Sequence, residues 1–112
     1  MIHPSRERRR ASRLTVRLPA RYRSEAISLD GMVADLSRSG LFLRSGFVDA
    51  EGTPAALRID LPGAPLDLLC EVARCWAPPS HGEAGMGLRF LSLPSPTRQR
   101  LANFILSHSM AH

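Results

Sequence analysis

The chain has 112 residues, enough for one domain with a single hydrophobic core and too few for two. Its 44% hydrophobic content is that of a soluble protein. No stretch approaches the roughly 20 apolar residues that a membrane span needs. The net charge is +5, and every basic side chain is arginine.

The positive charge is concentrated at the leading end. Residues 1–23 hold eight arginines and one glutamate, whereas residues 24–112 hold seven arginines and nine acids. This asymmetry favours an anionic partner at the leading end, with a solvated arginine-rich tail as the alternative. The two cysteines form no disulfide framework, and no signal peptide is visible. We therefore expect a cytoplasmic protein.

Residues 1–13 are polar and lack periodicity, which predicts a flexible arm, and residues 14–112 form the predicted folded domain. Residues 14–23 alternate apolar and polar side chains, the pattern of a half-buried strand. Asp30-Gly31 predicts a turn. In the next strand we expect the aliphatic set Met32, Ala34 and Leu36 to point inward, which leaves Asp35 and Ser37 on the outer face.

Four more strands follow in the pattern, at about 41–44, 57–61, 66–76 and 86–90. Arg74 is in register with Val72 and Trp76 on an apolar face, and we expect it to reach the barrel mouth, because an unpaired buried charge is costly. On an unbulged strand Cys70 and Cys75 would face opposite sides.

The period changes at the end of the chain, where Ser95 and Pro96 predict a helix start and an apolar stripe continues to His108. Six strands without intervening helices predict an all-β fold: a six-stranded antiparallel barrel closed at one end by a C-terminal α-helix.

Two short motifs suggest a nucleotide site. Arg9 and Arg13 offer two guanidinium groups, each able to bind phosphate oxygens and to stack on a base. Asp35 and Ser37 place a carboxylate and a hydroxyl on one face of a strand, where they can accept hydrogen bonds from a guanine edge. Gly40 then supplies a turn position where a positive φ has no cost.

These residues resemble the motifs of the PilZ family, the bacterial receptors for cyclic di-GMP. The family motifs are R-x-x-x-R on an N-terminal arm and [D/N]-x-S-x-x-G on a barrel strand, and the resemblance covers residues 7–107. It implies that Arg9, Arg13, Asp35, Ser37 and Gly40 bind cyclic di-GMP, that the arm moves on binding, and that the signal passes to a downstream protein.

Other residues are secondary candidates. Arg8 and Arg10 lie beside the motif arginines, with a solvated role as the alternative. Some relatives in the family add a strand arginine at the nucleotide, which makes Arg74 a candidate, with a plain ion pair as the alternative. Ser37 and Asp35 can also stabilise a turn through the local backbone.

The sequence offers little for catalysis or metal binding. The four histidines are scattered, and the cysteines lack the spacing of a zinc site. We expect no enzyme, no metal and no cofactor other than the nucleotide ligand.

Two rival functions stay open. A PilZ-like protein–protein adapter would work without nucleotide, although the motif residues of such domains are usually lost. A basic barrel for single-stranded nucleic acid would interleave aromatic residues with its cations, and aromatics are only 5% of this chain. The loop 44–56 and the C-terminal helix are the expected partner surfaces.

Overall fold

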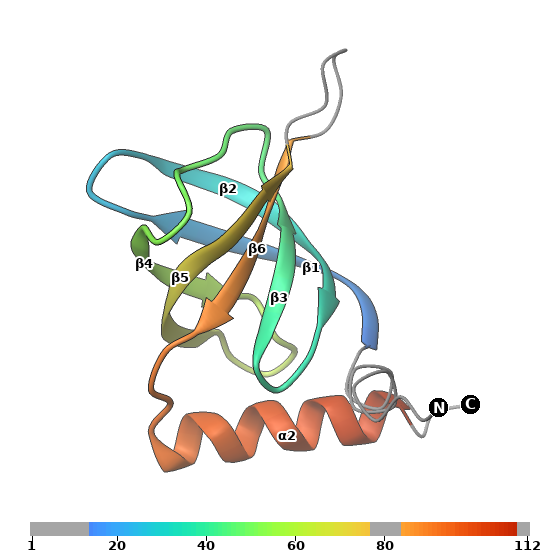
Figure 1. Cartoon of the computed structure of the whole chain (residues 1–112). Coiled ribbons are helices and arrows are strands. Elements are labelled where there is room, and N and C mark those ends of the chain that lie inside the picture. The colour runs from blue at the N-terminus through green and yellow to red at the C-terminus, as the bar shows by residue number, and fades with distance from the viewer. Residues whose placement is uncertain (1–13, 77–83, 110–112) are drawn as a thin grey trace, which may run out of the picture.

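The computed structural model describes residues 14–76 and 84–109. The predicted arm, residues 1–13, lies outside this range. The described part contains six strands and one helix (Figure 1). Their bounds are β1 Leu14–Arg23, β2 Ser28–Leu36, β3 Gly40–Arg44, β4 Pro54–Ile59, β5 Leu66–Trp76, β6 Gly85–Phe90 and α2 Ser95–Ser109.

The six strands close into an antiparallel barrel in the order β1-β2-β3-β6-β5-β4, with β4 paired back to β1. Every strand has a neighbour on both sides, so the sheet has no open edge that would invite aggregation. The predicted six-stranded antiparallel barrel is confirmed. The predicted bounds of its first strand, 14–23, and of its longest strand, 66–76, match β1 and β5.

The core fills the inside of the barrel with alternate residues of the strands. On β5 the buried side chains are Leu66, Leu68, Cys70 and Val72, as the alternation predicts. The one buried tyrosine, Tyr22, donates a hydrogen bond from its hydroxyl to the Asp49 carboxylate at 2.6 Å. Burial raises the pKa of the Tyr22 hydroxyl, and the nearby Asp49 carboxylate raises it further.

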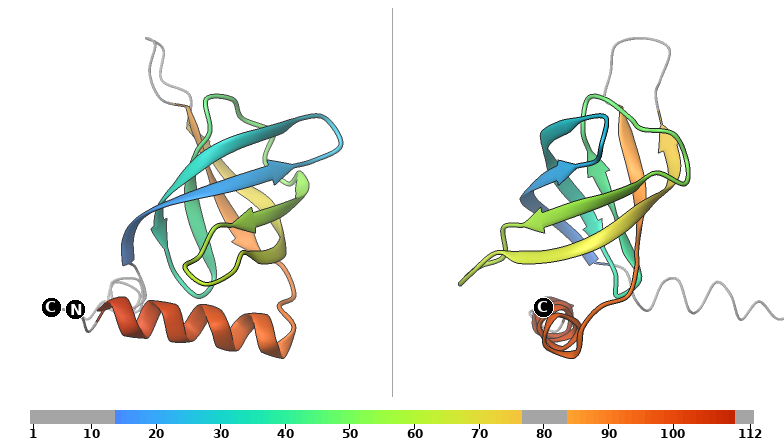
Figure 2. Two further views of the ribbon diagram at one scale, coloured as in Figure 1. Left: turned by 180° about the vertical axis from the view of Figure 1, so that it is seen from behind. Right: turned by 90° about the vertical axis from the view of Figure 1, so that its left-hand side faces the viewer.

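Helix α2 lies across one end of the barrel (Figures 1 and 2). It begins at Ser95, one residue before the predicted first helical position, and buries Leu101 and Ile105 against the barrel. Arg100 fastens the helix to the β4–β5 connection by donating hydrogen bonds to the carbonyls of Pro62, Ala64 and Pro65. No described helix is long and apolar enough to cross a membrane.

The predicted turn at Asp30-Gly31 is wrong. The chain reverses at Ser24–Ile27, where the Ser24 amide donates to the Ile27 carbonyl at 2.8 Å. Gly31 lies inside β2, and a Cβ there would sit 2.6 Å from the backbone oxygen of Arg44. Its glycine therefore permits a close approach of two strands rather than a turn.

Two β-bulges explain the other differences from the predicted faces. A register shift in β2 between Val33 and Asp35 sends Val33 and Leu36 inward, in place of the predicted inward set of Met32, Ala34 and Leu36. A second shift, in β5, lies between Val72 and Arg74. Each shift inserts one residue, so the alternation of faces restarts beyond it.

The bulge in β5 changes which way the end of this strand faces. Arg74 is exposed, as expected of an unpaired charge, but it lies on the outer wall and not on the apolar face that simple alternation gives it; Trp76 is also exposed. Cys75 packs against the core, so Cys70 and Cys75 do not lie on opposite faces; both are free thiols.

Candidate functional site

The predicted strand residues gather in a surface hollow of about 370 Å³ on the outer wall, where β2, β3, β6 and β5 run side by side (Figure 1). We call this the motif hollow. Six of its lining residues carry the argument: Asp35, Ser37, Gly40, Phe42, Arg74 and Gly87. They come from four strands and the β2–β3 turn, so the fold brings together residues that are far apart in the chain.

Asp35 reaches the outer wall because of the bulge in β2. With Val33 and Leu36 both buried, Asp35 stands on the outside of the strand and is half-buried. It lies opposite Thr15 of β1 and Phe42 of β3. The predicted outward position of this carboxylate is confirmed, although the register that produces it differs from simple alternation.

Ser37 has a local role in the β2–β3 turn. Its hydroxyl accepts hydrogen bonds from the amides of Ser39 and Gly40, both at 3.2 Å, and its own amide donates to the Gly40 carbonyl at 2.9 Å. This is the turn-stabilising role that the sequence left open. Ser37 thereby fixes the hairpin that forms one wall of the motif hollow.

Gly40 is required for a reason other than the predicted one. Its φ is not positive, and it is the first residue of β3, paired with Arg89 of β6. A Cβ at this position would lie 2.3 Å from the backbone oxygen of Leu88, far inside van der Waals contact. The glycine lets the backbones of β3 and β6 approach each other beneath the hollow.

Arg74 lies against Gly87, its partner in the β5–β6 register. A Cβ on Gly87 would lie 3.4 Å from Cγ of Arg74, so the arginine stem occupies the space above the glycine. The resemblance makes Arg74 a secondary candidate for this site, whereas the sequence alone does not single out Gly87. The signal available was a glycine within a strand, which marks close approach by another group.

The two arginines of the motif hollow differ in whether they have an ion-pair partner among the described residues. Arg89, on its rim, forms an ion pair with Glu71. The Arg74 guanidinium forms no hydrogen bond or ion pair with any other described residue. The hollow thus combines a carboxylate from β2, an uncompensated guanidinium from β5 and an aromatic ring, Phe42, from β3.

The four arginines predicted in the arm, Arg8, Arg9, Arg10 and Arg13, lie outside the described residues. Their contribution to a phosphate site therefore stays a prediction.

The described residues contain no candidate metal site. No cluster of three or more His, Cys, Asp or Glu side chains occurs among residues 14–76 and 84–109. Burial raises the pKa of the Cys70 thiol to about 12, which keeps it protonated and unreactive at neutral pH.

A model of the PilZ domain family matches residues 7–107 of the chain. This range covers both sequence motifs and all six described strands. A search of curated protein sequences gave no significant match.

Three solved structures show the same fold. A motility inhibitor of Bacillus subtilis, MotI/DgrA, has a TM-score of 0.76 at 17% identity, covering 88% of this chain and 49% of that one. The PilZ domain of CeSA from a cellulose-synthesizing bacterium has a TM-score of 0.68 at 17% identity, covering 87% and 97%. The PilZ domain of YcgR from Escherichia coli, solved with c-di-GMP, has a TM-score of 0.67 at 14% identity, covering 85% and 86%.

At these identities the structures establish a common fold alone. The chain spans about half the length of MotI/DgrA and most of the two isolated domains.

Proposed function

This chain belongs to the PilZ domain family, a family of binding domains and not of enzymes, and from that premise we propose that it is a receptor for cyclic di-GMP. The observation that carries the proposal is the motif hollow. It joins Asp35, Ser37 and Gly40, which the motif places close together, to Arg74 from a distant strand. YcgR, one of the structures with the same fold, was solved with c-di-GMP.

The roles of the side chains follow from their chemistry. The Asp35 carboxylate accepts hydrogen bonds from the N1–H and exocyclic amine of a guanine. Ser37 holds the hairpin that supports this contact and can turn its hydroxyl to the same base. Gly40 keeps the floor of the hollow flat, because any side chain there would meet β6. Arg9 and Arg13 bind phosphate oxygens and stack on the bases.

Arg74 extends the site toward β5. Its guanidinium is exposed and has no partner among the described residues, so binding an anion would not break an existing ion pair. It is therefore the strand cation best placed to meet a phosphate or a purine face. Arg8 and Arg10 remain secondary phosphate contacts.

Ordering the arm requires several contacts at once. Fixing backbone costs about 1–2 kcal/mol per residue, while one charged hydrogen bond contributes about 1.5–3 kcal/mol. A single arginine cannot order even a short segment. We infer that ligand binding changes the conformation of residues 1–13 as a unit, and that this new arrangement is relayed to a partner protein in the cytoplasm.

A calorimetric titration with cyclic di-GMP tests the proposal, with GTP and cyclic di-AMP as controls. We expect saturable binding of cyclic di-GMP and at least about tenfold weaker binding of both controls, since neither offers two guanine edges joined by a cyclic diphosphate. Equal affinity for cyclic di-AMP would remove the guanine-reading role of Asp35. No binding of any nucleotide would favour the nucleotide-independent adapter.

A further inference from the structure

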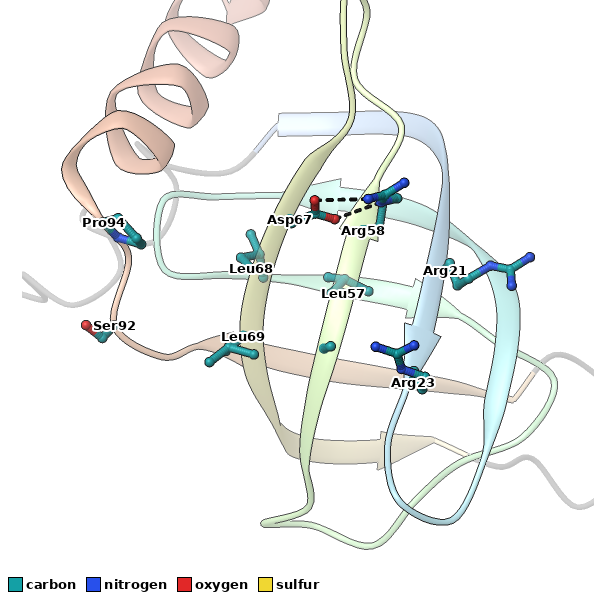
Figure 3. A pocket seen from close by; sticks show the side chains of 10 residues that line it. Arg21, Arg23, Leu57, Arg58, Asp67, Leu68, Leu69, Ser92 and Pro94 are labelled. Atoms are coloured by element: carbon teal, nitrogen blue, oxygen red, sulfur yellow. Dashed lines mark hydrogen bonds and ion pairs between the residues drawn. The ribbon is translucent and has the colours of Figure 1, made fainter.

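A second concave surface lies on the outer wall formed by β1, β4 and β5 (Figure 3). It consists of two hollows, of about 890 and 370 Å³, and both are lined by Arg23 and Leu69. We call the combined surface the Leu69 groove. The residues that form the argument are Arg23, Pro54, Ala56, Leu69, Leu91 and Pro94.

Cross-strand register organises this wall into rows. One row runs from Arg23 on β1 to Ala56 on β4 and on to Leu69 on β5. The adjacent row contains Arg21, Arg58 and Asp67. Because these strands are unbulged here, the side chains of each row stand next to one another on the outer face.

The charged row is already balanced. Arg58 donates two hydrogen bonds to the Asp67 carboxylate, at 2.8 and 3.2 Å, and Arg21 pairs with Asp30 on β2 at 3.2 Å. The guanidinium of Arg23, one row away, forms no hydrogen bond or ion pair within the described part of the chain. Glu25 also lines the smaller hollow but is not paired with Arg23. Arg23 is thus an exposed cation without a fixed counter-charge among residues 14–76 and 84–109.

The row that contains Arg23 is otherwise apolar. Leu69 is 58% exposed and Leu91 is 37% exposed. The Leu91 amide donates to the Leu69 carbonyl at 2.9 Å, which holds the two leucines side by side. Pro54 and Pro94 lie at the two ends of the groove and are also exposed. Adjacent exposed leucines next to an arginine are typical of a protein-binding surface, because apolar side chains that stay exposed to water gain free energy when a partner covers them.

We propose that the Leu69 groove is a docking site for an acidic, leucine-containing segment of a protein partner. A carboxylate of that segment pairs with Arg23, and its apolar side chains pack on Leu69, Leu91 and Ala56. The groove shares none of its six residues with the motif hollow, so docking does not depend on nucleotide binding and stands apart from the proposed receptor function.

Two other occupants fit the surface less well. Neither hollow of the groove is lined by an aromatic side chain, and two of the three nearby arginines are already neutralised, which disfavours single-stranded nucleic acid. A second copy of the chain bound about a two-fold axis would bring this same patch against itself, and its lining holds three arginines against two acids, so both surfaces would carry excess positive charge.

The test uses the full chain labelled with ¹⁵N and a blocked eight-residue peptide of alternating Glu and Leu. We expect shifts of amide resonances that centre on Arg23, Ala56, Leu69 and Leu91. The same peptide with Gln in place of Glu should bind about tenfold more weakly. Arg23→Gln and Leu69→Ser should each weaken binding of the Glu peptide about tenfold, and both are surface changes whose folding is checked by thermal unfolding.

Arg17→Gln is the matched control, since Arg17 is an exposed arginine of the same strand, β1, outside the groove. Its affinity should stay within twofold of the parent chain. The proposal is overturned if no amides shift, if the Gln peptide binds equally well, or if Arg23→Gln leaves binding unchanged. It is also overturned if an oligo-dT strand shifts the same amides more strongly, or if Leu69→Ser abolishes a dimer seen in sedimentation.

Discussion

The motif hollow and the Leu69 groove occupy different walls of one barrel and are built by different means. In the groove the strands pair in unbroken register, so charged and apolar residues fall into parallel rows. In the motif hollow two strands carry bulges and two positions lack side chains, Gly40 and Gly87. Regular pairing produces a surface of alternating rows, whereas irregular pairing brings a carboxylate and a guanidinium to a shared depression.

The difference predicts where each wall is fragile. The shape of the motif hollow depends on a close backbone contact that only glycine permits, at Gly40. The Leu69 groove depends on exposed side chains, each of which can be replaced without disturbing the strand pairing.

The largest effect should come from Gly40→Ala. The added Cβ would lie 2.3 Å from the Leu88 carbonyl oxygen, and because that neighbour is backbone, the β3–β6 pair must separate. We expect a loss of about 2–3 kcal/mol in the free energy of unfolding, measured by urea denaturation. Gly87→Ala is the matched control, since its Cβ meets a flexible side chain 3.4 Å away. Equal losses for the two variants would contradict the assignment of Gly40 to strand packing.

The next largest effect concerns the arm. Arg9→Ala and Arg13→Ala should each lower the affinity for cyclic di-GMP about tenfold or more, because each removes a charged contact to phosphate that we propose. Isothermal titration calorimetry measures this directly. Arg98→Ala, on α2 at the end of the barrel, should leave the affinity unchanged. Wild-type affinity in both motif variants would end the cyclic di-GMP model.

A smaller effect should distinguish the roles of Arg74 and Gly87. Arg74→Ala should lower cyclic di-GMP affinity about three- to fivefold, as expected for an exposed charge. Gly87→Ala should have a smaller effect, because its methyl group would only touch the arginine stem, 3.4 Å from Cγ of Arg74. In the Arg74→Ala background, Gly87→Ala should have no further effect. An undiminished effect in the double variant would show that the glycine acts independently of Arg74.

The smallest effect belongs to the groove wall. The Arg58 guanidinium lowers the pKa of the Asp67 carboxyl through hydrogen bonds and charge. The stability from this pair is therefore present above about pH 4 and is lost as pH falls through the lowered pKa. The contribution is small because both groups are exposed.

Asp67→Asn should reduce the difference in urea midpoint between pH 6 and pH 3, whereas Asp60→Asn, at an exposed position outside the ion pairs described, should not. An unchanged pH difference in Asp67→Asn would leave the pair without a role in stability.

Much of the fold is predictable from local patterns in the sequence. The alternation in residues 66–72 identifies which side chains are buried, because an unbulged strand repeats every two residues. In residues 14–23 the alternation of burial also holds, although the pairing of β1 with β2 shifts between Thr15 and Leu18. The change of period after Ser95 identifies the helix. These signals are properties of single segments.

The remaining features depend on pairs of strands. A bulge is an extra residue relative to a partner, so neither β2 nor β5 alone reveals it. For the same reason the sequence alone predicts a turn at Gly31 and a positive φ at Gly40, and the structure has neither. Local sequence patterns do not indicate the Leu69 groove, because Arg23 and Leu69 become neighbours only through the register of β4 between them.

The single inserted residue in β5, at Ala73, decides which chemistry the outer wall presents. If the same residues paired without the bulge, strict alternation would turn the Arg74 guanidinium into an interior that has no buried polar or charged residue among those described. The bulge thus shifts the alternation of inward and outward residues by one position. Arg74, which simple alternation would place inside, faces solvent without any change of side chain. A barrel of this kind can acquire or lose an outward-facing cation by a change in strand pairing alone.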